Sequence, residues 1–149
     1  WACTAFRQGM ADNNMDAKQL WNDSKDIDMF YDALAVAPQK VTEIMSVDNK
    51  ETLTKSQNTV YGFFCRYIKD CNNKKIRVLY RFLTGADVLA LEKLKVIFPL
   101  HVGNIPHITA HTCSGMVDLP SGGYLSYHDF ETQFDAMLNN PESWKFYVA

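Results

Sequence analysis

The sequence predicts an α+β fold in which several helices pack on a small sheet. Two stretches with apolar residues three or four positions apart, 57–69 and 76–83, indicate helices. The chain then changes to short runs of branched and apolar residues bounded by Gly and Pro, which indicate strands. A last helical pattern follows over 127–138. The predicted order is therefore helices, a small sheet and a closing helix.

The first fifty residues are predicted to be a helical, polar-rich segment. Their apolar residues recur at the spacing of one helix face: Leu20, Trp21, Ile27, Phe30, Tyr31 and Leu34. Pro38 is expected to open a further short helix. Residues 51–56 hold few large apolar groups and are predicted to link this segment, 1–50, to a second unit, 57–149.

The sequence predicts where each of the two helices over 57–69 and 76–83 ends. Residues 70–73 interrupt the first helix, and Gly85, just past the last periodic residue of the second, is a common helix stop. The short break between them predicts two adjacent antiparallel helices.

The second half is predicted to hold strands at Lys95–Phe98 and Gly115–Pro120, with a loop between them. After the turn at 121–123, Ser126 stands three residues before Asp129 in a capping arrangement. The closing helix is expected to start there and to end just before a proline.

The composition is that of a folded domain. Hydrophobic residues make up 47% and aromatic residues 13% of the chain, enough apolar area to offset the entropy of ordering it. The formal net charge of −2 and the scattered Lys and Arg argue against a nucleic-acid surface. No apolar run approaches the roughly 18 residues that span a bilayer. We expect no nucleic-acid partner, no membrane partner, and a cytoplasmic and/or nuclear location.

One cysteine has unusual surroundings. The four cysteines, Cys3, Cys65, Cys71 and Cys113, form no Cys-x-x-Cys pair, which favours reduced thiols over a secreted disulfide scaffold. Cys113 falls in the predicted loop 105–115, where exposure, an imidazole and backbone amides would favour the thiolate. His111 and Thr112 could supply these surroundings. On these residues alone, a small buried cysteine remains the alternative.

Separated elements, taken in order, resemble one known family. Residues 110–113, reading Ala-His-Thr-Cys, and residues 118–120, reading Asp-Leu-Pro, are similar to the catalytic signature of the HECT ubiquitin ligases. Residues 79–85, reading Leu-Tyr-Arg-Phe-Leu-Thr-Gly, resemble the family's helix-ending Phe-Val-Thr-Gly element. The aromatic-rich residues 61–64 resemble its preceding helix. Three elements in the right order make an accidental match improbable.

The resemblance implies a HECT C-lobe-like fold over residues 57–149, with residues 1–50 as a remnant of the larger N-lobe. Cys113 would accept ubiquitin as a thioester from a ubiquitin-conjugating enzyme and pass it to a lysine of a protein substrate. His111 and Thr112 would support this chemistry. Phe146, fourth from the end, matches a family phenylalanine that docks the C-lobe on the N-lobe. No cofactor and no metal are implied, and the chain alone would be a poor ligase.

Two positions depart from the family's pattern. Ser114 follows the cysteine where Phe is common, and Ile108 stands where Pro is common. They indicate a divergent member. They also keep open a rival reading, a non-catalytic ubiquitin-binding or protein-binding module that retains the C-lobe fold.

Two further uses of the cysteine need other partners. A zinc site would use His101, His107, His111 and Cys113, but their spacing fits no common zinc finger. A cysteine hydrolase would pair Cys113 with His128 and Asp129. His128 falls in the first turn of a predicted helix, where a capping or solvated role is favoured.

Overall fold

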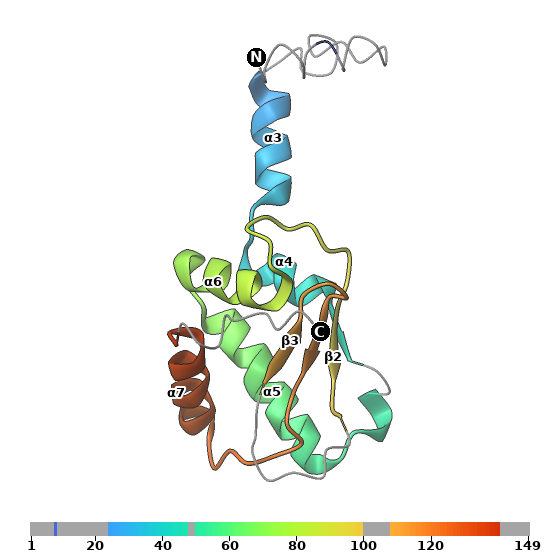
Figure 1. Ribbon diagram of the computed structural model, residues 1–149, viewed down its shortest axis with the longest axis vertical. Coiled ribbons are helices and arrows are strands. Elements are labelled where there is room, and N and C mark those ends of the chain that lie inside the picture. The colour runs from blue at the N-terminus through green and yellow to red at the C-terminus, as the bar shows by residue number, and fades with distance from the viewer. Residues whose placement is uncertain (1–7, 9–23, 48–49, 100–107, 141–149) are drawn as a thin grey trace. The chain divides into compact units, whose positions relative to one another are not determined.

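The structure, a computed structural model, describes residues 8, 24–47, 50–99 and 108–140. The chain divides into two compact units, Trp1–Ala35 and Val36–Ala149. The first unit contains the helix α3, Ser24–Leu34 (Figure 1). The second unit contains the sheet, the other labelled helices and Cys113.

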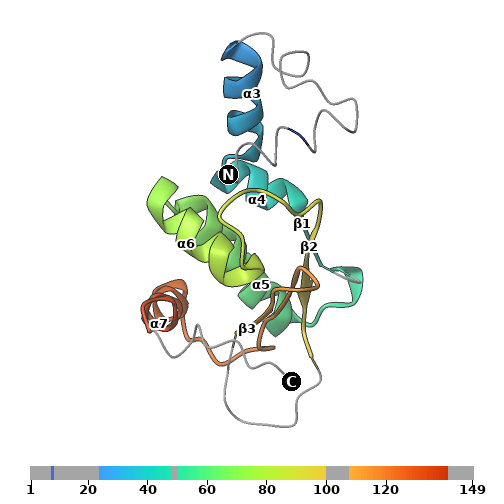
Figure 2. The ribbon, with the colours of Figure 1, turned by 45° about the horizontal axis from the view of Figure 1, so that its top comes forward.

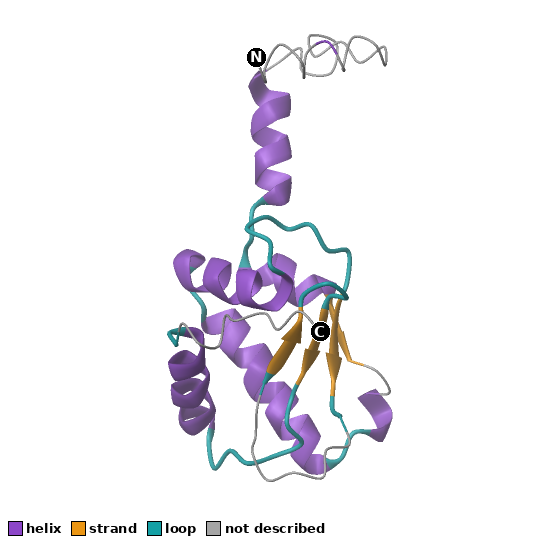
Figure 3. Cartoon of the chain, in the orientation of Figure 1, coloured by secondary structure: helices purple, strands orange, loops and turns teal. Residues whose placement is uncertain are grey.

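The second unit alternates helices and short strands along the chain. Their bounds are Pro38–Ile44 for α4, Met45–Val47 for β1, Lys50–Thr52 for the 3-10 helix η1, Lys55–Asp70 for α5, Asn73–Thr84 for α6, Leu94–Ile97 for β2, Thr109–His111 for β3, Met116–Asp118 for β4 and Tyr127–Leu138 for α7. The described residues of the unit form helices and one small sheet, so the predicted α+β class is confirmed (Figure 3). None of the described helices is long and apolar enough to cross a membrane.

The helix ends follow from local side chains. Thr54 and Gln57 form a reciprocal capping box at the start of α5. Gly85 ends α6 with a φ of 74°, a left-handed conformation that glycine adopts without steric cost. The hydroxyl of Ser126 accepts the N–H of Asp129 at the start of α7. The predicted stop at Gly85 and the predicted cap at Ser126 are both confirmed.

The four strands form one sheet in the order β1-β2-β4-β3. β2 runs parallel to β1 and to β4, whereas β3 pairs antiparallel with β4 at the edge. Leu94, Val96 and Val117 are fully buried on one face of the sheet. Ala110 pairs with Val117 on this face, so its neighbour His111 lies on the opposite, outer face.

The helices cover the buried face in layers. The sheet and α7 lie on opposite sides of α5 (Figures 1 and 2). Aromatic rings fill the space between α5 and α7, with ring centroids 4.7 Å apart for Tyr67 and Phe134. The expected antiparallel pairing of α5 with α6 is wrong: α5 packs mainly on α4 and α7, whereas α6 packs mainly on β3. This placement brings α6 to the hairpin that β3 and β4 form.

The structure corrects the predicted boundary between the units. It lies after residue 35, and the segment 36–47, expected in a separate helical part, belongs to the second unit. Val41 of α4 is fully buried in the core, and β1 is an edge strand of the sheet. The expected linker 51–56 holds part of η1 and the start of α5. A three-residue strand has too little alternation to be recognised from sequence, and its partner β2 is distant along the chain.

Candidate functional site

Cys113 lies in the turn that joins β3 to β4, and its side chain is exposed. The backbone N–H of Ser114 donates to the carbonyl of His111 at 3.1 Å, and the Ser114 hydroxyl donates to the same oxygen at 3.2 Å. These bonds close the turn directly after β3. The predicted position of Cys113, exposed and between strands, is confirmed. The loop predicted over 105–115 is corrected, because β3 occupies its middle.

Gly115 lets this turn pack closely against residues 91–93, just before β2. Its φ is 61°, and a Cβ there would lie 3.0 Å from Leu91 Cδ1 and 3.1 Å from the carbonyl oxygen of Lys93. Its own carbonyl accepts the N–H of Lys95 at 2.8 Å. Glycine is therefore required by both conformation and space. The turn is held at the sheet edge with the Cys113 side chain left in solvent.

A histidine and a carboxylate meet across the same hairpin. His111 Nε2 lies 2.9 Å from Asp118 Oδ2, with 44% of the histidine side chain and 19% of the aspartate side chain exposed. A carboxylate that binds one ring nitrogen fixes the orientation of an imidazole. The sequence placed Asp118 within the Asp-Leu-Pro motif but indicated no chemical role for its carboxylate. The contact between His111 and Asp118 depends on the pairing of β3 with β4, and β3 was not predicted from the sequence.

Thr112 lies against the end of α6. A Cβ added at Gly85 would lie 3.8 Å from Thr112 Cβ. Just beyond, the Tyr80 hydroxyl accepts the backbone N–H groups of Ala90 and Leu91, each at 3.2 Å, and so anchors the chain that follows α6. The sequence elements 79–85 and 110–113, distant along the chain, are therefore neighbours in space.

The other described cysteines are less accessible than Cys113: Cys71 is buried and Cys65 is half-buried. Burial raises the pKa of the Cys71 thiol to about 11, and burial is also the main cause that raises the pKa of the Cys65 thiol. Thiols with raised pKa values are rarely ionised near neutral pH, so they are poor nucleophiles. Cys113 is the exposed thiol within the described ranges, and Cys3 lies outside them.

The hydrolase arrangement is not brought together. The His128 side chain is 88% exposed in the first turn of α7, and Asp129 accepts the N–H of Leu125 at 3.0 Å. α7 begins near one end of the sheet, whereas the turn with Cys113 lies at the other end (Figure 1). His128 and Asp129 therefore belong to the start of α7 and are not brought to the Cys113 thiol.

The remaining candidates lie partly outside the described residues. His101 and His107 of the zinc alternative and Phe146 of the lobe-docking prediction fall there. Over the part of the chain that is described, no group of three His, Cys, Asp or Glu side chains could hold a metal ion.

The two departures from the family's pattern have local explanations. Ile108 is only 7% exposed and joins the hydrophobic core. Ser114 is exposed, and its hydroxyl bonds within the turn. An apolar residue at the first place and a polar one at the second both suit these surroundings.

No protein-family model matches this chain, and no curated protein matches it either. The resemblance to HECT ligases therefore depends on the chain's own sequence elements. Two of these elements, residues 79–85 and the signature at 110–113 and 118–120, meet at the β3–β4 hairpin and the adjoining end of α6.

Proposed function

We propose that this chain is the ubiquitin-accepting lobe of a HECT-type ubiquitin ligase. The single observation that carries the proposal is the exposed thiol of Cys113 in a turn that glycine and hydrogen bonds hold in place. Transthiolation needs an accessible thiolate at attacking distance from a carbonyl. Among the described cysteines, Cys113 best meets this requirement.

The reaction has two steps at one sulfur. The Cys113 thiolate attacks the thioester carbonyl of ubiquitin on a conjugating enzyme, a new thioester forms, and the cysteine of the conjugating enzyme leaves as a thiolate. A lysine amine of the substrate protein then attacks this carbonyl, an isopeptide bond forms, and the Cys113 thiol is released. Each step develops negative charge on the carbonyl oxygen. His111, the Thr112 hydroxyl and backbone N–H groups of the turn are the groups that would stabilise it.

The partners are ubiquitin, a ubiquitin-conjugating enzyme and a protein substrate, and the place is the cytoplasm or nucleus. The chemistry needs no metal and no cofactor. Phe146 would dock this lobe on an N-lobe during transfer, as the resemblance implies.

A second candidate is a non-catalytic module that binds ubiquitin or another protein. Ser114 favours it, because the family commonly has Phe after its cysteine. The two candidates differ in one measurable property, the formation of a covalent ubiquitin adduct.

The test mixes the protein with ubiquitin that carries a C-terminal thioester to a small thiol, a reagent that bypasses recruitment of a conjugating enzyme. We expect an adduct with one ubiquitin that reductant releases. Cys113→Ala should abolish it, whereas Cys65→Ala and Cys71→Ala should retain it. An undiminished adduct in Cys113→Ala contradicts the proposal. Ubiquitin binding without any adduct favours the module instead.

A further inference from the structure

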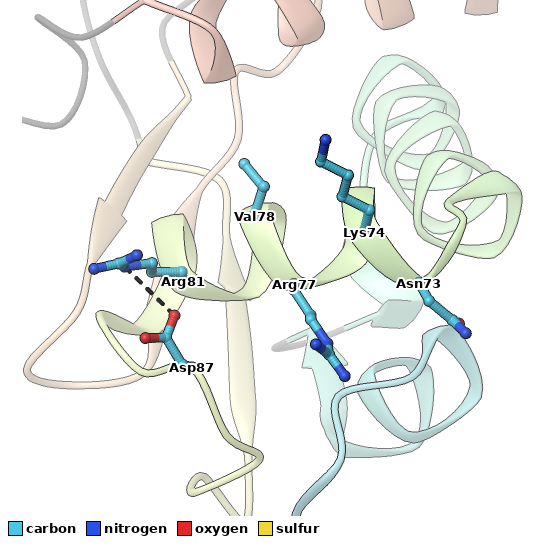
Figure 4. Close-up of a pocket in the computed structure, with 6 residues that line it drawn as sticks. All are labelled: Asn73, Lys74, Arg77, Val78, Arg81 and Asp87. Atoms are coloured by element: carbon cyan, nitrogen blue, oxygen red, sulfur yellow. Dashed lines mark ion pairs between the residues drawn. The ribbon is translucent and has the colours of Figure 1, made fainter.

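The outer face of α6 carries a basic hollow of about 460 Å³. Its lining residues are Asn73, Lys74, Arg77, Val78, Arg81 and Asp87 (Figure 4). All but one of them come from α6, and Asp87 follows just after its end. We call this surface the α6 hollow.

The cations of the α6 hollow leave the helix about one turn apart. Lys74, Arg77 and Arg81 are spaced three and four residues apart, so their Cβ atoms follow one another at roughly 5–6 Å. Figure 4 shows Lys74 and Arg77 pointing to opposite edges of the hollow. Lys75 differs, because its Nζ lies 2.9 Å from Asp135 Oδ1 of α7. The side of α6 opposite the hollow is core, where Leu79 is fully buried.

The α6 hollow has an excess of positive charge. Arg81 Nε lies 3.5 Å from Asp87 Oδ1, an ion pair between two largely exposed side chains. No carboxylate of the described residues forms an ion pair with Lys74 or Arg77. Val78, 37% exposed, places an apolar group among these charges. The excess stands out on a chain whose formal net charge is −2.

The α6 hollow also leads to the candidate site. α6 packs on β3, and Gly85 at its end is a neighbour of Thr112, which precedes Cys113. A segment bound along α6 would therefore end close to the thiol. A lysine next to that segment would be held near the thioester.

We infer that the α6 hollow docks an acidic segment of the substrate protein, with carboxylates one helical turn apart and an apolar residue between them. Charge complementarity selects this occupant, and Val78 provides its apolar contact. A nucleic acid fits less well, because its affinity comes from neutralising many phosphates and this surface has two cations without an ion pair among the described residues. The identity of the partner as the substrate rests on the proposed function, whereas the docking itself does not.

Fluorescence anisotropy with a labelled helical peptide tests the docking. The peptide carries Glu residues one turn apart with Leu between them, and its control carries Gln in place of Glu. We expect the Glu peptide to bind, less tightly as salt is added. The pair Lys74→Gln and Arg77→Gln should weaken binding roughly three- to tenfold. The matched pair Lys55→Gln and Lys69→Gln, exposed on α5, should leave it unchanged.

A charge-retaining pair guards against misfolding. Lys74→Arg with Arg77→Lys should bind as the unaltered protein does. Equal binding of the Gln peptide, equal weakening by both neutral pairs, or tighter binding of a DNA or RNA oligonucleotide would overturn the inference. Its failure is separable from that of the proposed function, because binding needs no thioester. If the protein forms the ubiquitin adduct but does not bind the Glu peptide, only the docking inference is refuted.

Discussion

His111 Nε2 and Asp118 Oδ2 lie 2.9 Å apart across the hairpin whose turn carries Cys113. His111 is the last residue of β3 and Asp118 the last of β4, so the contact is diagonal across two antiparallel strands. It joins the Ala-His-Thr-Cys element to the Asp-Leu-Pro element. In the proposed reaction, Asp118 is a positioning residue that acts through His111.

Asp118→Asn tests this relationship. We expect the thioester on Cys113 to form and its transfer to lysine to slow roughly tenfold, because His111 loses the carboxylate that orients it. The free energy of unfolding should change by at most about 1 kcal/mol, since the pair is partly exposed. Single-turnover transfer measures the rate, with the exposed Glu92→Gln as control. Equal rates for both variants would leave Asp118 without a role in transfer.

Gly115→Ala should destabilise the protein by about 2 kcal/mol, because alanine must adopt a φ of 61° and its Cβ meets a side chain and a carbonyl oxygen. The measurement is urea unfolding. Gly62→Ala is the matched control, since a Cβ at that exposed position of α5 meets nothing within 4 Å. It should stabilise the protein by about 0.5–1 kcal/mol. Equal effects of the two substitutions would mean that the turn does not require glycine.

Alkylation should distinguish the cysteines. In the folded protein near neutral pH, a small alkylating reagent should modify Cys113 first, because its thiol is exposed. Cys71 should react much more slowly, since burial raises the pKa of its thiol to about 11. Mass spectrometry of proteolytic fragments locates the label over time, with Cys3 replaced by Ser throughout. Labelling of Cys71 ahead of Cys113 would contradict the assignment of the accessible thiol.

The free energy of unfolding should fall as pH rises from 9 to 11. The Cys71 thiol ionises near its ordinary pKa of 9 in the unfolded chain and near 11 in the folded protein. Between these values the unfolded state binds fewer protons, so stability falls by at most about 1.4 kcal/mol per pH unit from this group. Below pH 9 its contribution is constant.

Cys71→Ala should therefore make the slope of stability against pH shallower between pH 9 and 11. Urea unfolding at several pH values measures that slope. Val41→Ala is the control, because it also removes buried apolar atoms but no titrating group. It should lower stability at every pH and keep the slope. A slope that Cys71→Ala leaves unaltered would show that this thiol titrates alike in both states.

Local chemistry made the helix ends predictable. The stop at Gly85 and the cap at Ser126 depend on residues next to each other in sequence, and both lie where the sequence placed them. β1 and β3 escaped prediction, because three residues show little alternation and their pairing depends on distant strands.

The candidate site was likewise predictable from the sequence only in part. The exposed position of Cys113 followed from Gly and Pro around the turn. The contact of His111 with Asp118 did not, because it exists only once β3 pairs with β4. The α6 hollow also could not be predicted from the sequence. Only the folded helix shows that Lys75 pairs with Asp135, whereas Lys74 and Arg77 line the hollow.

The most direct test of the central claim is the bond between ubiquitin and residue 113. The protein, joined to a HECT N-lobe that recruits the conjugating enzyme, is mixed with conjugating enzyme charged with ubiquitin and analysed with and without reductant. We predict an adduct that reductant releases in the unaltered protein, one that resists reductant in Cys113→Ser because an oxyester replaces the thioester, and none in Cys113→Ala. A reductant-sensitive adduct that persists in Cys113→Ala, or the absence of any adduct in the unaltered two-lobe protein, would contradict the account.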